Sequence, residues 1–236
     1  MMWICYIIMI VVPYLLGGIN TSIIATRVRS GKDIRDMGSG NAGLTNTLRT
    51  QGKAVAGVVL LGDVAKAVLS IWAVRLAFLF IGGVDTTVLS NEMNWVGYMA
   101  GLMVVVGHVL PVYYGFRGGK GVATLVGAVT GIYPPVALLC FGVWLVMLMV
   151  SHYVSLASMV AGCSFPIFTL ISPKVNGSTA FVVFSFVIAI LLIYTHRKNI
   201  ERLKAGTESK TFIWKPRRVK LDDEERKKSG KEHDRE

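Results

Sequence analysis

The stretch AVAGVVLLGDVAKAVLSIWAVRLAFLF, residues 54–80, is long and apolar enough to cross a lipid bilayer as a helix. With 53% hydrophobic residues among 236 and a mean hydropathy of +0.56, the whole chain is too apolar for a soluble domain of this size. We therefore predict an all-α, polytopic membrane protein with seven transmembrane helices. The other predicted spans are residues 1–25, 95–114, 121–133, 135–150, 156–172 and 178–194.

The distribution of charge predicts how these spans are oriented. The first span lacks a positive leading segment, so we expect a retained helix and not a signal peptide. Arg27, Arg29, Lys32 and Arg35 follow it, whereas residues 82–94 contain no Lys or Arg. The positive-inside rule then places the N-terminus outside and the C-terminus in the cytoplasm.

The net charge of +11 arises largely near the C-terminus, because fourteen of the 25 Lys and Arg residues follow Tyr194. Most others flank apolar runs, so we expect contact with anionic membrane lipids and no nucleic acid. Residues 1–210 should form the membrane domain. Residues 211–236 should be a charged, disordered cytoplasmic tail without a catalytic role.

The apolar runs also contain three cysteines and a pair of charged residues. Cys5, Cys140 and Cys163 are expected to be small buried hydrophobes, not disulfide partners or metal ligands. Asp63 and Lys66 lie three positions apart and therefore on one face of a helix. They either form a mutually satisfied pair that fixes helix packing or directly support a functional site.

Residues 38–53, GSGNAGLTNTLRTQGK, favour an oxyanion ligand. Their glycines allow backbone N–H groups to converge on an anion, and their Ser, Thr, Asn and Arg side chains add donors. The GxGxxG match at 38–43 is not a dinucleotide fingerprint, since no βαβ unit surrounds it. A P-loop is excluded as well, because Lys53 and Lys120 lack its required neighbours. The alternative is a polar connector between two membrane helices.

A second Gly-rich segment, GHVLPVYYGFRGGKGVAT, covers residues 107–124. Arg117 and Lys120 lie among glycines immediately before the next apolar helix, whose positive N-terminal end would point into the same cytoplasmic pocket. Ser155 belongs to a polar turn and could cap a helix or donate to a ligand. Residues 196–208, HRKNIERLKAGTE, predict a short interfacial helix that stops at Gly206.

With these three segments, the chain resembles the bacterial acyl-phosphate-dependent glycerol-3-phosphate acyltransferases, small seven-helix enzymes of the cytoplasmic membrane. The likeness covers residues 1 to about 210. It implies transfer of a fatty acyl group from acyl phosphate to the sn-1 hydroxyl of glycerol 3-phosphate. The products would be lysophosphatidic acid and phosphate, in the first acylation of phospholipid synthesis. No cofactor or metal is implied.

The resemblance also implies site residues. Ser39, Arg49, Lys120 and His196 would be catalytic. The acyl phosphate would be held near Ser39 and Arg49, and glycerol 3-phosphate near Lys120 and His196. The implied substrate-binding residues are Gly38, Gly40, Asn41, Gly43, Thr45, Asn46, His108, Arg117, Gly118, Gly119, Gly121, Ser155, Asn199 and Glu208.

The histidines bear on the choice of acyl donor. Acyltransferases that use thioesters commonly carry a His-x4-Asp pair, and His108, His152 and His196 are followed five positions later by Tyr, Ala and Glu. An acyl phosphate is already activated, so positioning and charge stabilisation could suffice, with a substrate phosphate oxygen or His196 taking the proton. The rival hypothesis is a small phosphate or organophosphate transporter, although the chain shows no paired half-repeats.

Overall fold

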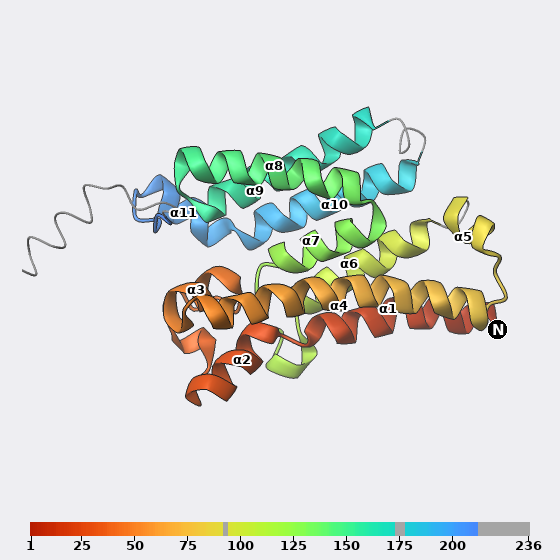
Figure 1. The fold of residues 1–236 in the computed structure, drawn as a ribbon, viewed down its shortest axis with the longest axis horizontal. Coiled ribbons are helices and arrows are strands. Elements are labelled where there is room, and N and C mark those ends of the chain that lie inside the picture. The colour runs from red at the N-terminus through yellow and green to blue at the C-terminus, as the bar shows by residue number, and fades with distance from the viewer. Residues whose placement is uncertain (92–93, 173–177, 212–236) are drawn as a thin grey trace, which may run out of the picture.

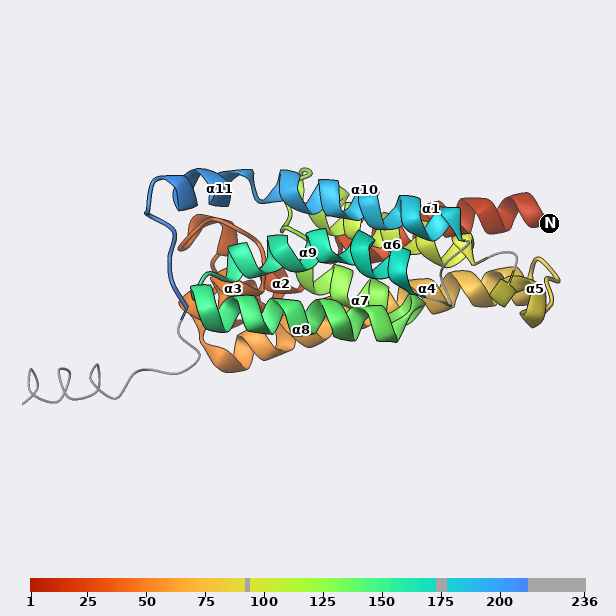
Figure 2. The same cartoon turned by 90° about the horizontal axis from the view of Figure 1, so that it is seen from above.

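The computed structural model describes residues 1–91, 94–172 and 178–211, and every regular element within these ranges is a helix. The long helices run along one axis of the molecule, and the short helices α2, α3 and α11 gather at one end, opposite α5 and the N-terminus (Figures 1 and 2). The elements are α1 (Met2–Gly18), α2 (Thr21–Ser30), η1 (Ile34–Asp36), α3 (Leu44–Gln51), α4 (Lys53–Phe80), α5 (Thr86–Asn91), α6 (Trp95–Val109), η2 (Val112–Tyr114), α7 (Val122–Ile132), α8 (Pro134–Ser151), α9 (Val154–Ile171), α10 (Thr179–Thr195) and α11 (Arg197–Lys204).

Five helical segments of the described chain are long and apolar enough to cross a membrane, or six if α10 and α11, bent by 56°, count as one span. The fourth predicted span is α7, which has 11 residues. It is therefore about 16 Å long, well short of a hydrocarbon core of about 30 Å. The helical membrane fold is confirmed, whereas the number seven and the membrane side of each terminus stay predictions.

Close helix packing in the bundle depends on glycine. A Cβ on Gly17 of α1 would overlap the carbonyl oxygen of Val104 in α6, and a Cβ on Gly107 of α6 would overlap the carbonyl oxygen of Tyr14 in α1. Small residues let backbones approach closely in lipid, where helix association depends on packing rather than on the hydrophobic effect. This contact fixes α6, which carries His108 in its last turn.

The predicted first span, residues 1–25, lies within one candidate membrane span, Met2–Ser30, in which the helix is interrupted at Ile19 and Asn20 between α1 and α2. Asn20 caps the second helix, its Oδ1 accepting from the Ile23 N–H at 3.0 Å, while its amide nitrogen donates to the carbonyl of Ala42 at 3.3 Å. Lys66 binds the freed carbonyl of Ile19 at 2.9 Å. The break thus directs α2 away from the bundle and towards the Gly-rich loop.

Residues 38–53 are not loop throughout, because 44–51 form helix α3, which begins after an extended Gly43. The predicted helix at 196–206 is confirmed as α11, and the chain turns at Gly206 with φ of +70°. Ile200 and Leu203 of α11 pack on the main hydrophobic core. Both short helices therefore lie at the end of the bundle where the predicted motifs meet.

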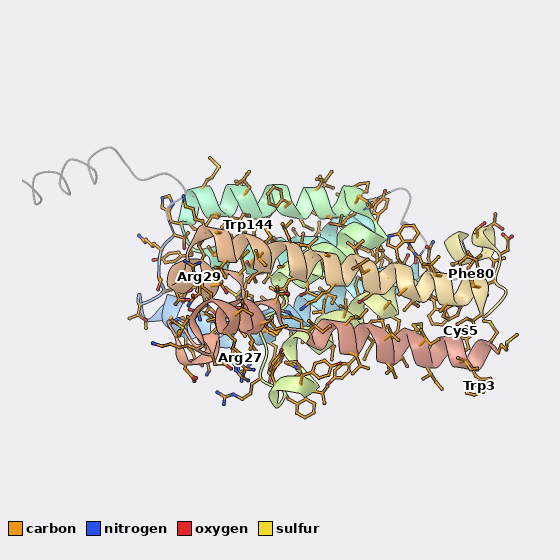
Figure 3. All side chains as sticks on the ribbon, turned by 60° about the horizontal axis from the view of Figure 1, so that its bottom comes forward. Trp3, Cys5, Arg27, Arg29, Phe80 and Trp144 are labelled. Atoms are coloured by element: carbon orange, nitrogen blue, oxygen red, sulfur yellow. The ribbon has the colours of Figure 1, made fainter. Side chains whose placement is uncertain are left out.

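The outer surfaces of the two ends differ in chemistry. Arg27 and Arg29 extend from the α2 end, whereas Trp3 and Phe80 lie at the opposite end (Figure 3). Asp33 pairs with Arg27 at 2.7 Å and with Arg35 at 2.9 Å. The hydrogen bonds from Arg35, against the opposing effect of burial, hold the pKa of Asp33 far below its usual value.

The cysteines do not all follow the expectation of burial. Cys5 is buried, Cys140 is half-buried and Cys163 is exposed on α9. The expectation is wrong for Cys163, because an apolar residue of a membrane helix can face lipid as well as the protein core. The predicted tail, apart from residue 211, lies outside the described residues.

Candidate functional site

A cavity of about 380 Å³ opens among α3, α4, α7, α8, α9 and α10 and has an apolar part and a polar part. One part, here called the apolar groove, is lined by Leu60, Val126, Cys140, Phe141, Trp144 and Phe165. The other part, here called the polar head, is lined by Ser39, Asn41, Thr45, Arg49, Lys120, Ser155, His196, Asn199, Arg202 and Glu208. Three groove residues, Leu60, Val126 and Phe141, are also exposed on the outer surface of the bundle.

The loop that carries Ser39 is shaped from within by Asn46. The buried Asn46 side chain donates to the carbonyls of Ile34, Met37 and Asn41, and its oxygen accepts from the Ser39 N–H at 3.0 Å. Gly38 has φ of +55°, and a Cβ there would overlap the Asn46 oxygen. Asn46 therefore stabilises the loop, because its amide hydrogens bond to backbone carbonyls and are not directed at a ligand in the cavity.

Two helix N-termini contribute to the polar head. Gly43, Leu44 and Thr45 at the start of α3 line the cavity, as do Gly121, Val122 and Ala123 at the start of α7. The first N–H groups of a helix lack intrahelical partners and carry partial positive charge, so two such ends at one cavity favour an anion. This is the arrangement expected from the sequence for α7, and α3 adds a second helix end.

A relay of polar side chains leads from Lys120 to Glu208. The Lys120 ammonium donates to the amide oxygen of Asn199, and the Asn199 amide nitrogen donates to Glu208 Oε1 at 2.8 Å. Ser155 donates to the same oxygen at 2.9 Å, and Arg202 binds Glu208 Oε2 at 2.7 Å. Glu208 therefore connects α9 to α11 and orients Asn199, and Ser155 binds Glu208 instead of capping α9.

The electrostatics of this relay follow from burial and hydrogen bonding. Burial lowers the pKa of Lys120 to about 8, against the opposing attraction of Glu208. Burial alone would raise the pKa of Glu208, but hydrogen bonds from Arg202, Asn199 and Ser155 hold it below its usual value. At neutral pH the polar head thus contains a protonated Lys120 and an ionised Glu208 whose oxygens are both occupied.

His196 is buried between α10 and α11 and lines the polar head. Its Nδ1 lies 2.8 Å from the carbonyl oxygen of Leu192. Because a carbonyl only accepts, Nδ1 carries the hydrogen, and the neutral ring then presents Nε2 as an acceptor. This tautomer suits a hydrogen bond from a substrate hydroxyl.

A second cavity of about 340 Å³ adjoins the first and is strongly basic. The two share Ser39, Asn41, Lys120, Asn199 and Arg202. The described residues that line the second cavity include no carboxylate, and its cations are Arg35, Arg117, Lys120, Arg197, Lys198 and Arg202.

Every predicted site residue except Gly38 lines at least one of these two cavities. Gly40, Arg117, Gly118 and Gly119 line only the second, and the remaining predicted residues line the first or both. Sequence reasoning missed Arg202 and Asn20. The available signals were an arginine six positions before Glu208 on an amphipathic helix and a lone asparagine near the end of an apolar span.

A family model and several relatives match most of the chain. The family model described as glycerol-3-phosphate acyltransferase matches residues 7–206. A glycerol-3-phosphate acyltransferase of Clostridioides difficile is 45% identical over 206 residues, covering 87% of this chain and 95% of the relative. One of Coxiella burnetii is 39% identical over 208 residues, covering 88% and 99%.

Two solved structures share the fold. The glycerol 3-phosphate form of PlsY, an integral membrane glycerol 3-phosphate acyltransferase, superposes with a TM-score of 0.74 at 36% identity, covering 86% of this chain and 94% of that one. Its lysophosphatidic acid form gives a TM-score of 0.70 at 35% identity, with the same coverage.

The membrane fold and a cavity that joins an apolar groove to a polar head are features of an integral membrane enzyme with a lipid-like substrate or product. The match over nearly the whole membrane domain then specifies the family. The chain belongs to the glycerol-3-phosphate acyltransferases.

Proposed function

We propose that this protein transfers a fatty acyl group from acyl phosphate to the sn-1 hydroxyl of glycerol 3-phosphate at the cytoplasmic face of the cell membrane. The sn-1 oxygen forms an ester bond with the acyl carbon while the bond between that carbon and the phosphate oxygen breaks. The products are lysophosphatidic acid and inorganic phosphate. The observation that carries the proposal is a single cavity in which an apolar groove meets two helix N-termini and a buried lysine.

The two substrates fit different parts of the cavity. The acyl chain would occupy the apolar groove, with its phosphoryl group at Ser39, Thr45 and Arg49 beside the α3 N-terminus. Glycerol 3-phosphate would enter from the basic second cavity and bind near Lys120 and Asn199, which belong to both cavities. The lipid product would leave between α4 and α8, where groove residues are exposed on the bundle surface.

Charge placement supports acyl phosphate as the donor. Phosphate is a good leaving group, so the protein needs to hold two anionic substrates together and stabilise developing charge more than it needs a strong base. The hydroxyl proton would pass to a phosphate oxygen of the substrates or to Nε2 of His196. The cations and helix N-termini of the polar head are suited to holding two anionic substrates together.

The decisive experiment supplies purified protein in detergent with radiolabelled glycerol 3-phosphate and one donor at a time. We expect lysophosphatidic acid with acyl phosphate and none with acyl-coenzyme A or acyl carrier protein free of phosphotransacylase. Comparable turnover with a thioester would refute the donor assignment. Uptake of label into sealed proteoliposomes without lipid product would favour the transporter instead.

A further inference from the structure

Three buried polar side chains meet directly beneath the polar head. Lys66 of α4 is 8% exposed, Asp63 of the same helix 1% and His108 of α6 3%. The Lys66 Nζ lies 2.8 Å from Asp63 Oδ1, 2.9 Å from His108 Nδ1 and 2.9 Å from the carbonyl oxygen of Ile19. Thr21 also donates to Asp63 Oδ1 at 3.1 Å. Asp63 and His108 themselves line the cavity.

The position of Lys66 decides which histidine nitrogen carries a proton. Asp63 lies 3.7 Å from His108 Nδ1, which alone would suggest a histidine base oriented by a carboxylate. The Lys66 ammonium, however, is closer to both groups and has three hydrogens and no acceptor. His108 Nδ1 must therefore accept from Lys66, so the hydrogen of the neutral ring is on Nε2.

The other face of the ring is directed at the Gly-rich segment. A Cβ on Gly119 would overlap both His108 Nε2 and the carbonyl oxygen of Ala42, so the nitrogen lies where the second Gly-rich segment meets the first. The hydrogen bond and the ion pair of the His108 ring both involve Nδ1. Within the part of the chain that the structure describes, Nε2–H is thus a neutral donor at the cavity wall that makes no hydrogen bond to a protein acceptor.

We propose that His108 donates a hydrogen bond from Nε2 to a substrate phosphate oxygen, and that Lys66 and Asp63 are positioning residues that set this tautomer. Lys66 turns what would be a base into a donor, and Asp63 balances the charge of Lys66. Because Lys66 also binds the Ile19 carbonyl, the same residue ties the tautomer to the break between α1 and α2. The proposal rests on the proposed function only for the identity of the phosphate ligand.

The tautomer can be measured without any turnover. In protein labelled with ¹⁵N-histidine, the ring ¹⁵N shifts and one-bond ¹⁵N–¹H couplings of His108, assigned by comparison with His108→Gln, report which nitrogen is protonated. We expect hydrogen on Nε2, and a change in the Nε2–H signal when inorganic phosphate is added. Hydrogen on Nδ1, or an Nε2–H signal unaffected by saturating phosphate, would overturn the proposal and leave the proposed acyl transfer standing.

Kinetics of purified variants supply a second test. Gln places an amide nitrogen at the Nε2 position and Asn places one at the Nδ1 position, so His108→Gln should keep kcat/KM within about threefold while His108→Asn loses about 10- to 100-fold. Lys66→Met should cost a similar factor in wild type but less than about threefold in His108→Ala, because Lys66 acts through the ring. Equal losses in both backgrounds, or equal activity of the Gln and Asn variants, would refute it. If Lys66→Met fails to fold, the wild-type spectrum still decides.

Discussion

The pH dependence of glycerol 3-phosphate binding tests the role of Lys120 most directly. Burial lowers the pKa of this lysine to about 8, so in the free enzyme it is protonated below that pH and neutral above it. Only the protonated form offers a charge to a phosphate. We therefore expect kcat/KM for glycerol 3-phosphate to fall by less than about a fifth between pH 7 and 7.5 and more steeply as the pH rises through 8.

The magnitude follows from the fraction of protonated lysine. At pH 9, one unit above the free-enzyme pKa, about a tenth of the molecules carry the charge, so kcat/KM should fall about tenfold. Lys120→Ala removes the charge at every pH. It should lower kcat/KM at pH 7 by about 10- to 100-fold, equivalent to about 1.5–3 kcal/mol, and abolish the decline above pH 8.

Another group of the polar head that titrated in this pH range would produce the same decline in kcat/KM. The pKa of Glu208 is lowered, so this carboxyl does not titrate between pH 7 and 9. The second ionisation of a phosphate monoester, near pH 6, is complete below this window. Lys120→Arg should retain part of the activity with no decline up to pH 9.

The assay measures initial rates with saturating acyl phosphate at pH 7–9, corrected for spontaneous hydrolysis of the donor. A decline of equal size in wild type and Lys120→Ala would refute the reasoning, because the titrating group would then be elsewhere.

Three further predictions concern the loops, the packing and the topology. Arg49→Lys keeps the charge but loses the planar guanidinium, so most activity in the detergent assay should disappear. The activity of the control Arg29→Lys, at an exposed position on α2, should stay within about twofold of wild type. The reverse ranking of these two activities would show that Arg49 does not belong to the site. Gly17→Ala should lower the thermal unfolding temperature in detergent, since overpacking costs about 1–3 kcal/mol, and Gly57→Ala, with open space around it, should not; equal melting temperatures would contradict the packing argument. A cysteine at Thr50, in a variant without the native cysteines, should react with an impermeant reagent only after the inner face of the membrane is exposed. Labelling of this cysteine in intact cells would contradict the predicted topology.

Much of the site could be predicted from local sequence. The apolar runs alone indicate a helical membrane protein, because a bilayer core leaves few alternatives to the α-helix. The positions of Ser39 and Lys120 could be predicted because their segments are dense in glycine, hydroxyl and basic residues, which have little reason to interrupt apolar helices except to bind a polar ligand. His196 was implied only by the family resemblance. All three residues line the same cavity.

Other features needed three-dimensional contacts. The end of α1 at Gly18 depends on Asn20 reaching the loop and on Lys66 reaching a carbonyl 47 positions away. Hydropathy averages over a window and cannot register a single long-range hydrogen bond.

The role of each polar side chain was decided by the tertiary structure. Sequence composition marked Asn46 and Ser155 as possible ligand donors, and the family resemblance implied Glu208 as a substrate-binding residue. The fold bonds each of the three to other protein groups. The sequence likewise placed Asp63 and Lys66 on one helix face, but only the packing of α6 against α4 brings in His108. Hydrogen-bonding capacity belongs to the residue type, whereas the partner is decided by which backbones the folded chain brings within about 3 Å of it.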